Sequence, residues 1–205
     1  MSQMKPDQWL QWICDSSSTE ELTKNYDQWA EKYEQDVLEV WDGVPKAAAA
    51  LLAEYIDDTS KLILDVGAGT GLTGAALHAL GFSQIHGMDI SAQMLDKAKA
   101  KSIYNSLYCC AINALQLHGS ERPHAMIATG VFADKHGNAD DLLHLSRQLR
   151  DGGMMVFTVR ESFLSEIRPI IDRPEWELKK SITLPIYQDP MYLLAYHIST
   201  KYGQA

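Results

Sequence analysis

The sequence has little cysteine, no long apolar run and no excess of basic residues, and each shortage excludes a class of protein. Its three cysteines, Cys14, Cys109 and Cys110, are an odd number without regular spacing, which argues against a disulfide framework and suits a reducing compartment. It contains no CxxC or HExxH motif, so we expect no metal site. No stretch reaches the roughly 18 consecutive apolar residues of a membrane-spanning helix, and the first ten residues do not resemble a signal peptide. We therefore expect a cytoplasmic protein with no membrane partner.

The charge balance is acidic, with 27 Asp and Glu against 18 Lys and Arg and a net charge of −9. An acidic surface repels phosphate backbones, so we expect no nucleic-acid partner. A chain of 205 residues with 46% hydrophobic content is typical of one domain with a buried core. We expect a single domain over residues 1–205, as a monomer or a homodimer.

The first part of the chain is predicted to be helical. A polar break at residues 16–19 can cap a helix in which Tyr26, Trp29, Ala30, Tyr33 and Val37 recur at helical spacing. Pro45 begins a further helix that is predicted to end near residues 57–58. We therefore assign residues 1–58 to N-terminal helices and residues 59–205 to the core.

The core alternates between strand-like and helical segments. Apolar strand-like runs are separated by segments typical of helices, which predicts βαβ units and a doubly wound, Rossmann-like, mostly parallel sheet of the α/β class. The last two runs have no room for a helix between them, so they predict a C-terminal antiparallel hairpin and a total of seven strands. The predicted strands are 62–66, 84–89, 107–112, 125–129, 154–159, 177–184 and 191–200, and the predicted core helices are 72–80, 92–101 and 140–149.

A glycine-rich turn follows the first predicted strand, from Asp65 to Gly71. Glycines allow a ligand to approach the backbone, and the helix that follows presents free N–H groups at the carboxyl end of the sheet. Asp65 precedes the first glycine, where a carboxylate would repel a pyrophosphate but could accept a hydrogen bond from an ammonium group. Asp89 ends the second predicted strand, where it could accept from both hydroxyls of a ribose.

A dinucleotide site is the competing interpretation. Residues 69–74 match GxGxxG, and Asp89 follows at the distance typical of the ribose-binding acid of NAD enzymes. Asp65 and the terminal hairpin favour S-adenosylmethionine, which has an amino-acid end, over NAD.

Two segments carry a family resemblance. Residues 63–71 (ILDVGAGTG) and 87–91 (GMDIS) resemble the first two motifs of class I S-adenosylmethionine-dependent methyltransferases. Residues 26–37 and 81–87 are similar to the methyltransferase-like proteins of the Williams–Beuren syndrome region and their bacterial relatives. The resemblance runs from about residue 26 to residue 198. It implies a Rossmann-like fold, S-adenosylmethionine as cofactor, and methyl transfer, but no particular substrate. We expect a small-molecule acceptor that the sequence does not identify.

The resemblance also implies roles for individual residues. Gly67 and Gly69 would lie against the methionine part of the cofactor, with Asp65 near its amino group. Asp89 would bind the ribose and Ile90 would pack on the adenine. Met94 would cover the adenine ring, Tyr26 and Tyr33 would form a helical lid, and the remaining residues expected at the cofactor are Ala68, Gly71, Ala111, Ile112, Asn113 and Thr129.

Two features of the site stay open at the level of sequence. Family members often carry an Asp after the third strand that accepts from the adenine amino group, whereas this chain has Ala111. Either Asn113 or the backbone of Ala111 and Ile112 would have to replace it. The catalytic candidates are His136 as a general base, Arg160 as a partner for an anionic acceptor, and Tyr26.

Three alternatives to methyl transfer also remain open. The first is a cyclase or lyase that uses the same cofactor and releases methylthioadenosine. The second is a cofactor-binding module that regulates a partner protein. The third is an NAD oxidoreductase.

Overall fold

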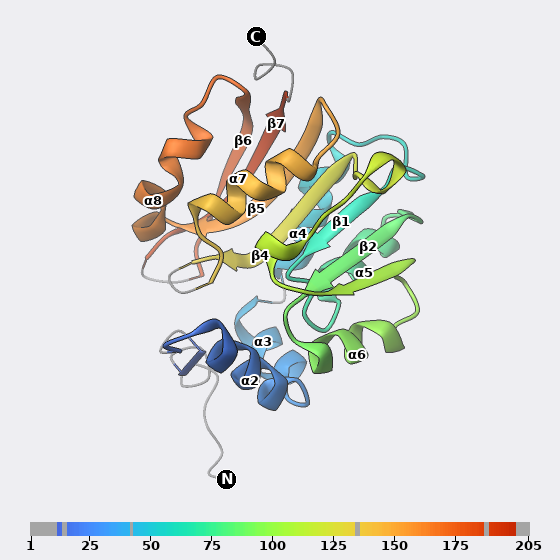
Figure 1. Ribbon diagram of the computed structural model, residues 1–205, viewed down its shortest axis with the longest axis vertical. Helices are drawn as coiled ribbons and strands as arrows, with labels where there is room; N and C mark the ends of the chain where they lie inside the picture. Colours follow the sequence, from blue (N-terminus) through green and yellow to red (C-terminus); the bar gives the residue numbers. More distant parts are fainter. Residues whose placement is uncertain (1–11, 14–15, 42, 134–135, 187–188, 200–205) are drawn as a thin grey trace.

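The computed structural model describes residues 12–13, 16–41, 43–133, 136–186 and 189–199 (Figure 1). Cys14, the first ten residues and the end of the last predicted strand at Thr200 lie outside these ranges. The described residues form a seven-stranded sheet in the order β3-β2-β1-β4-β5-β7-β6. Strands β1 to β5 pair in parallel, and β7 pairs antiparallel with both β5 and β6. The predicted α/β fold with a C-terminal hairpin is therefore confirmed.

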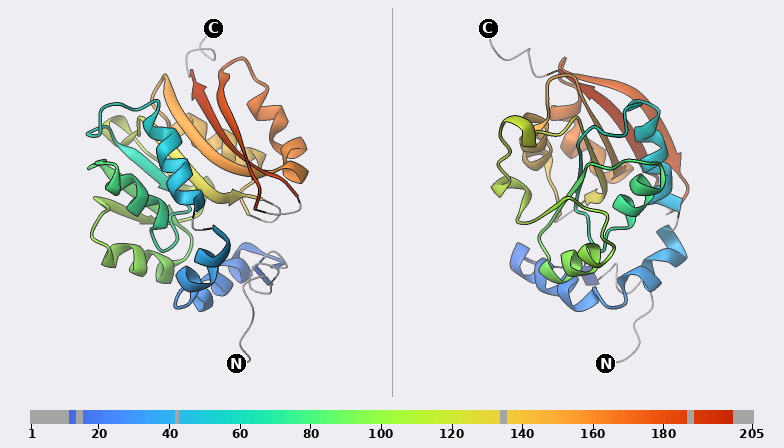
Figure 2. Two further views of the ribbon diagram at one scale, coloured as in Figure 1. Left: turned by 180° about the vertical axis from the view of Figure 1, so that it is seen from behind. Right: turned by 90° about the vertical axis from the view of Figure 1, so that its right-hand side faces the viewer.

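The parallel strands are buried on both faces, as continuous apolar runs require. In β1 (Ile63–Val66), Leu64 and Val66 face a cluster with helices α7 (Ala139–Gln148) and α8 (Glu161–Ile171). Ile63 faces the opposite cluster, which contains α4 (Gly43–Ala53) and α5 (Leu72–Ala79). The views from behind and from the side show helices on both faces of the sheet (Figure 2).

The predicted strands of the core agree with the observed ones to within a few residues. The remaining strands are β2 (Ile85–Asp89), β3 (Ser106–Cys109), β4 (Ala125–Phe132), β5 (Gly153–Arg160), β6 (Trp176–Leu184) and β7 (Met191–Ile198). Strand β3 ends before the predicted Ile112, because Ile112–Ala114 forms a 3-10 turn, η1. Helix α6 (Ala92–Ala100) begins as predicted, with the Ser91 hydroxyl accepting from the Met94 N–H at 3.1 Å.

Three helical segments differ from the prediction. Helix α8 was not predicted. The helix expected from the spacing of Tyr26 to Val37 is broken into α2 (Thr19–Trp29) and α3 (Tyr33–Trp41). Helix α4 ends at Ala53, before the predicted end near residues 57–58. That residues 1–58 form one N-terminal unit stays a prediction, and α4 packs on the sheet and not with α2 and α3.

Helices α2 and α3, here called the lid helices (residues 19–41), lie across the edge where the parallel strands end (Figure 1). Polar contacts attach them to α6 and its cap. The Ser91 hydroxyl donates to Asp27 Oδ1 at 2.5 Å. Lys97 pairs with Glu31 at 2.7 Å and Lys101 with Glu34 at 2.6 Å. Among the described residues, no helix has the length and apolar content needed to cross a membrane.

Candidate functional site

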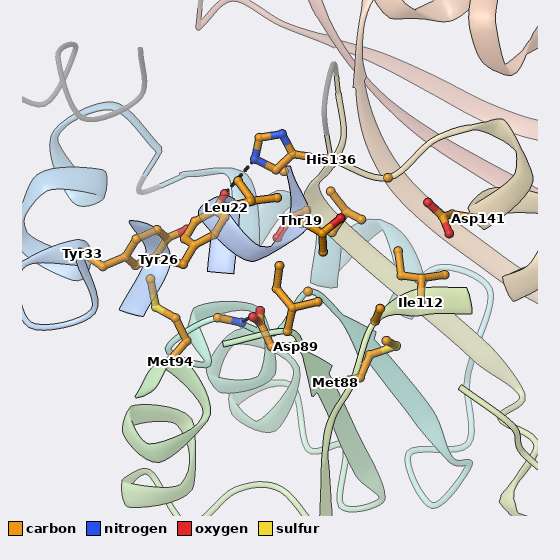
Figure 3. Close-up of a pocket in the computed structure, with 18 of the residues that line it drawn as sticks. Thr19, Leu22, Tyr26, Tyr33, Met88, Asp89, Met94, Ile112, His136 and Asp141 are labelled. Atoms are coloured by element: carbon orange, nitrogen blue, oxygen red, sulfur yellow. Dashed lines mark hydrogen bonds between the residues drawn. The ribbon is translucent and has the colours of Figure 1, made fainter. Parts of the chain in front are cut away.

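A cavity of about 300 Å³ lies between the carboxyl ends of β1, β2 and β4 and the lid helices (Figure 3). Most of the residues predicted for the site line it. They are Tyr26, Tyr33, Gly67, Gly69, Asp89, Ile90, Met94, Ala111, Ile112, Asn113, Thr129 and His136. Four predicted residues, Asp65, Ala68, Gly71 and Arg160, are not among the described residues that line the cavity. Arg160 ends β5 and precedes the first residue of α8.

The glycine loop forms the floor of the cavity and requires glycine at its turns. Gly67 and Gly69 have φ values of +65° and +55°, a region that other residues rarely adopt. A Cβ on Gly67 would lie 2.5 Å from Val131 Cγ2, so the loop also packs too closely for a side chain there. Gly71, with φ of +91°, precedes α5 as its N-cap.

Asp89 ties the glycine loop to the end of β2. Its Oδ2 accepts from the Gly69 N–H at 2.8 Å, and its Oδ1 accepts from the Ser91 N–H at 2.9 Å. Burial raises the pKa of Asp89, while the bonds from these two N–H groups lower it. An ionised carboxylate has about four acceptor positions. The two that remain can accept from a pair of neighbouring hydroxyls on a ligand in the cavity.

Asp65 lies beneath the loop instead of in the cavity. It is 1% exposed, and its Oδ2 accepts from the Tyr104 hydroxyl at 2.7 Å. Its Oδ1 has no hydrogen-bond partner within the part of the chain that the structure describes. Burial raises the pKa of Asp65 to about 7, with the nearby charge of Asp89 adding to the rise and the Tyr104 bond opposing it.

Tyr104 is a residue of this region that the sequence did not reveal. Its ring fills the space beside three glycines: a Cβ on Gly74 would overlap the Tyr104 hydroxyl, and a Cβ on Gly71 or Gly87 would lie 3.1 or 2.9 Å from its ring. Burial raises the pKa of Tyr104, so it stays a donor to Asp65. The sequence signal that could have indicated Tyr104 was the presence of these three glycines, which together leave room for one large side chain.

Tyr26 and His136 meet at the roof of the cavity. Tyr26 Oη lies 3.1 Å from His136 Nε2, and the two rings meet edge to face with centroids 6.0 Å apart. Beside them, the Trp29 indole N–H donates to Asp36 Oδ2 at 2.9 Å, which fixes that carboxylate within the lid. This arrangement can pass a proton between a bound molecule, a phenol and an imidazole.

Gly130 and Val131 follow the fourth predicted strand, where the sequence predicts a segment that lines the site near the methyl group, and both line the cavity beside Thr129. Other residues of the cavity wall were not predicted from the sequence. They come from the lid helices and from the start of α7, and include Thr19, Leu22, Asp36, Val37, Trp41, Asn138 and Asp141. Asn138 and Asp141 form a capping box at the start of α7. That sequence pattern marks a helix start but does not indicate which cavity the helix faces.

Comparisons with known proteins agree with this geometry. Residues 63–153 match the family model described as "Methyltransferase domain". The chain is 36% identical over 140 residues to human Methyltransferase-like protein 27. The matched region is 66% of this chain, and the chain spans little more than half, 56%, of that relative's length.

Solved structures share the fold over most of the chain. One is the 1,6-didemethyltoxoflavin-N1-methyltransferase of Burkholderia thailandensis with bound 1,6-didemethyltoxoflavin and S-adenosylhomocysteine. It has a TM-score of 0.64 and 15% identity over 90% of this chain and 91% of that chain. Another is the magnesium protoporphyrin IX methyltransferase of Synechocystis PCC 6803 with bound SAM, with a TM-score of 0.61 and 13% identity over 93% and 90% of the two chains. At these sequence identities the similarity shows a shared fold and nothing about the activity.

Proposed function

We propose that this chain, whose residues 63–153 belong to the S-adenosylmethionine-dependent methyltransferase family, transfers a methyl group to a small-molecule acceptor. One observation carries the proposal. The Asp89 carboxylate accepts from the Gly69 N–H at 2.8 Å and lines a cavity of about 300 Å³, with acceptor positions left for a ribose. That volume is at the lower end of the range typical of small-molecule sites.

The residues present fit an adenosyl cofactor. Asp89 would bind the ribose hydroxyls, and Gly67 and Gly69 would let the methionine part lie against the loop backbone. Ile90, Met94 and Ile112 would provide apolar contacts for the adenine. When bound, the cofactor supplies a methyl group already activated on a sulfonium, so the protein need only align the acceptor and exclude water.

Asp65 argues against a dinucleotide in the same place. Its carboxylate lies beneath the loop, where in its ionised form it would repel a pyrophosphate and favour an ammonium group. Gly74, the last glycine of the GxGxxG match, packs against the Tyr104 hydroxyl. The last glycine of a dinucleotide-binding loop is also a packing position, so Gly74 does not distinguish the two cofactors.

The wall between the lid and β4 supports a small acceptor. Leu22, Val37, Trp41 and Val131 are apolar or aromatic and line the cavity under the lid helices. A macromolecule would have to enter beneath helices that are attached to α6 by two ion pairs. The Burkholderia relative in fold carries a small heterocyclic compound beside S-adenosylhomocysteine, which is consistent with this proposal.

We assign proton transfer to Tyr26 and His136. Tyr26 Oη would take the proton from the nucleophilic atom of the acceptor while its own proton passes to His136 Nε2, 3.1 Å away. A positioned base of this kind typically contributes ~10²–10⁴-fold to rate when the acceptor must lose a proton.

Calorimetry with S-adenosylmethionine, S-adenosylhomocysteine and NAD, followed by product analysis with a panel of phenols and amines, tests the proposal. We expect both adenosyl compounds to bind, NAD not to bind, and S-adenosylhomocysteine to form in the presence of an acceptor. Binding of NAD without adenosyl binding would overturn the cofactor assignment. Formation of methylthioadenosine would replace methyl transfer by cyclase or lyase chemistry.

A further inference from the structure

The side of the cavity opposite Met94 and Tyr33 is formed by η1 and the start of α7 (Figure 3). Ile112 of η1 and Ala139 and Leu143 of α7 pack against the same apolar cluster. His144 of α7 lies with Nε2 2.8 Å from the Leu115 carbonyl oxygen, just after η1. The first turn of α7 is therefore held against the segment at Ala111–Asn113, which lines the cavity.

Asp141 is the carboxylate on this side of the cavity. Figure 3 shows it beyond Ile112, with its carboxyl group directed toward the pocket. Its Oδ2 accepts from the Asn138 N–H at 3.2 Å, and its own N–H donates to Asn138 Oδ1 at 3.0 Å. This pair of bonds holds the Asp141 side chain in one orientation, with Oδ1 left to meet a ligand.

A purine that packs between Ile90 and Ile112 presents its polar edge to the protein on one side. The exocyclic amine of adenine is a donor, and a carboxylate only accepts, so the two are complementary. Ala111 and Ile112 offer no acceptor in their side chains, and an amide such as Asn113 can serve a donor or an acceptor equally well. Asp141 is therefore the lining group near this segment that would distinguish a 6-amino purine from a 6-oxo purine.

We infer that Asp141 binds the amino group of the cofactor's adenine and sets the preference for adenosyl over inosyl compounds. The inference rests on the proposed function, because it assumes that the cavity holds an S-adenosyl compound with its ribose at Asp89. It assigns Asp141 a ligand-binding role in addition to capping α7.

The test is calorimetric binding of S-adenosylhomocysteine and S-inosylhomocysteine to the wild type, Asp141→Asn and Asp140→Asn. In Asp141→Asn the new side chain keeps an oxygen that can cap α7 but offers an amide donor to a 6-oxo group. We expect Asp141→Asn to lower the adenosyl affinity by roughly 10–100-fold, the size of a bond to a charged group, and to leave the inosyl affinity equal or higher. Asp140 is exposed in the same helical turn, so Asp140→Asn should behave as the wild type.

The ratio of the adenosyl affinity to the inosyl affinity separates the outcomes. Equal losses for both ligands in Asp141→Asn would mean that Asp141 only caps α7, and would overturn the inference. Unchanged binding of both ligands, or an effect confined to the KM for an acceptor, would also overturn it. If the wild type bound neither ligand, the proposed function itself would be wrong.

Discussion

Tyr26 Oη lies 3.1 Å from His136 Nε2, although 110 positions separate the two residues in the chain. One belongs to a lid helix and the other to the connection between β4 and α7. Their contact requires the lid to be docked over the strand ends. The pair to which we assign proton transfer would therefore be complete only when the cavity is covered, which would link water exclusion to the chemistry.

Replacing either member of this pair should slow methyl transfer without preventing cofactor binding. We expect Tyr26→Phe and His136→Gln each to reduce the rate of S-adenosylhomocysteine formation by roughly 10²–10⁴-fold for an acceptor that must lose a proton. Because the two groups act in series, the double variant should be no slower than the slower single variant. Multiplied losses in the double variant would mean that the two residues act independently.

Asp89 should dominate the affinity for the adenosyl group. Asp89→Ala removes the acceptor proposed for the ribose and also frees the N–H groups of Gly69 and Ser91. We expect the binding of S-adenosylhomocysteine to weaken by roughly 1.5–3 kcal/mol, the scale of hydrogen bonds to a charged group. Calorimetry on the variant measures this loss, and undiminished affinity would remove Asp89 from the site.

Asp65 should make the stability of the protein depend on pH. Because burial raises its pKa from 3.8 to about 7, the folded state binds a proton more tightly than the unfolded state between these values. The folded protein therefore loses stability as pH rises from about 4 to about 7, with an upper bound of ~4 kcal/mol at 1.36 kcal/mol per unit.

Asp65→Asn cannot ionise but can still accept from Tyr104. We expect this variant to be more stable than the wild type at pH 8, with the advantage disappearing near pH 4. Urea unfolding across this range measures the difference. Parallel stability curves for the two proteins would contradict the assignment of the titration to Asp65.

The ion pairs from α6 should hold the lid helices in place. In Lys97→Ala/Lys101→Ala we expect faster amide hydrogen exchange in residues 19–41 and unchanged exchange in the central strands. Global stability should change by only ~0–1 kcal/mol per pair, because partly exposed pairs contribute little. High salt should have the same effect on the wild type. Lys99→Ala, an exposed position on the same helix, is the matched control and should leave the exchange unchanged.

The core elements were predictable because each depends on local sequence. The apolar run at residues 62–66 and the Ser91 cap specify a strand and a helix start whatever surrounds them. Helix α8 was not predicted, although Phe163, Ile167 and Ile170 recur at helical spacing; it contains Pro169, a residue that usually breaks a helix. Burial of that apolar face against the sheet outweighs the cost of the proline.

The floor of the site was predictable, whereas for its roof the sequence predicted the residues Tyr26, Tyr33 and His136 but not how they meet. Gly67, Gly69 and Asp89 lie within one strand–turn–helix–strand unit, so their spacing alone places them together. The contact of Tyr26 with His136, and the approach of Asp141 to the cavity, depend on how the lid and α7 pack. Such contacts join segments far apart in the chain, and no local pattern specifies them.

The ring of Tyr104 and the glycines at 71, 74 and 87 occupy one shared volume. A larger residue at any of those three positions would demand a smaller one at 104, and a smaller residue at 104 would leave a void under the loop with Asp65 facing it. We therefore expect substitutions at these four positions to occur together or not at all. Gly74 therefore reflects the size of a neighbouring aromatic residue and carries no information about which nucleotide the loop binds.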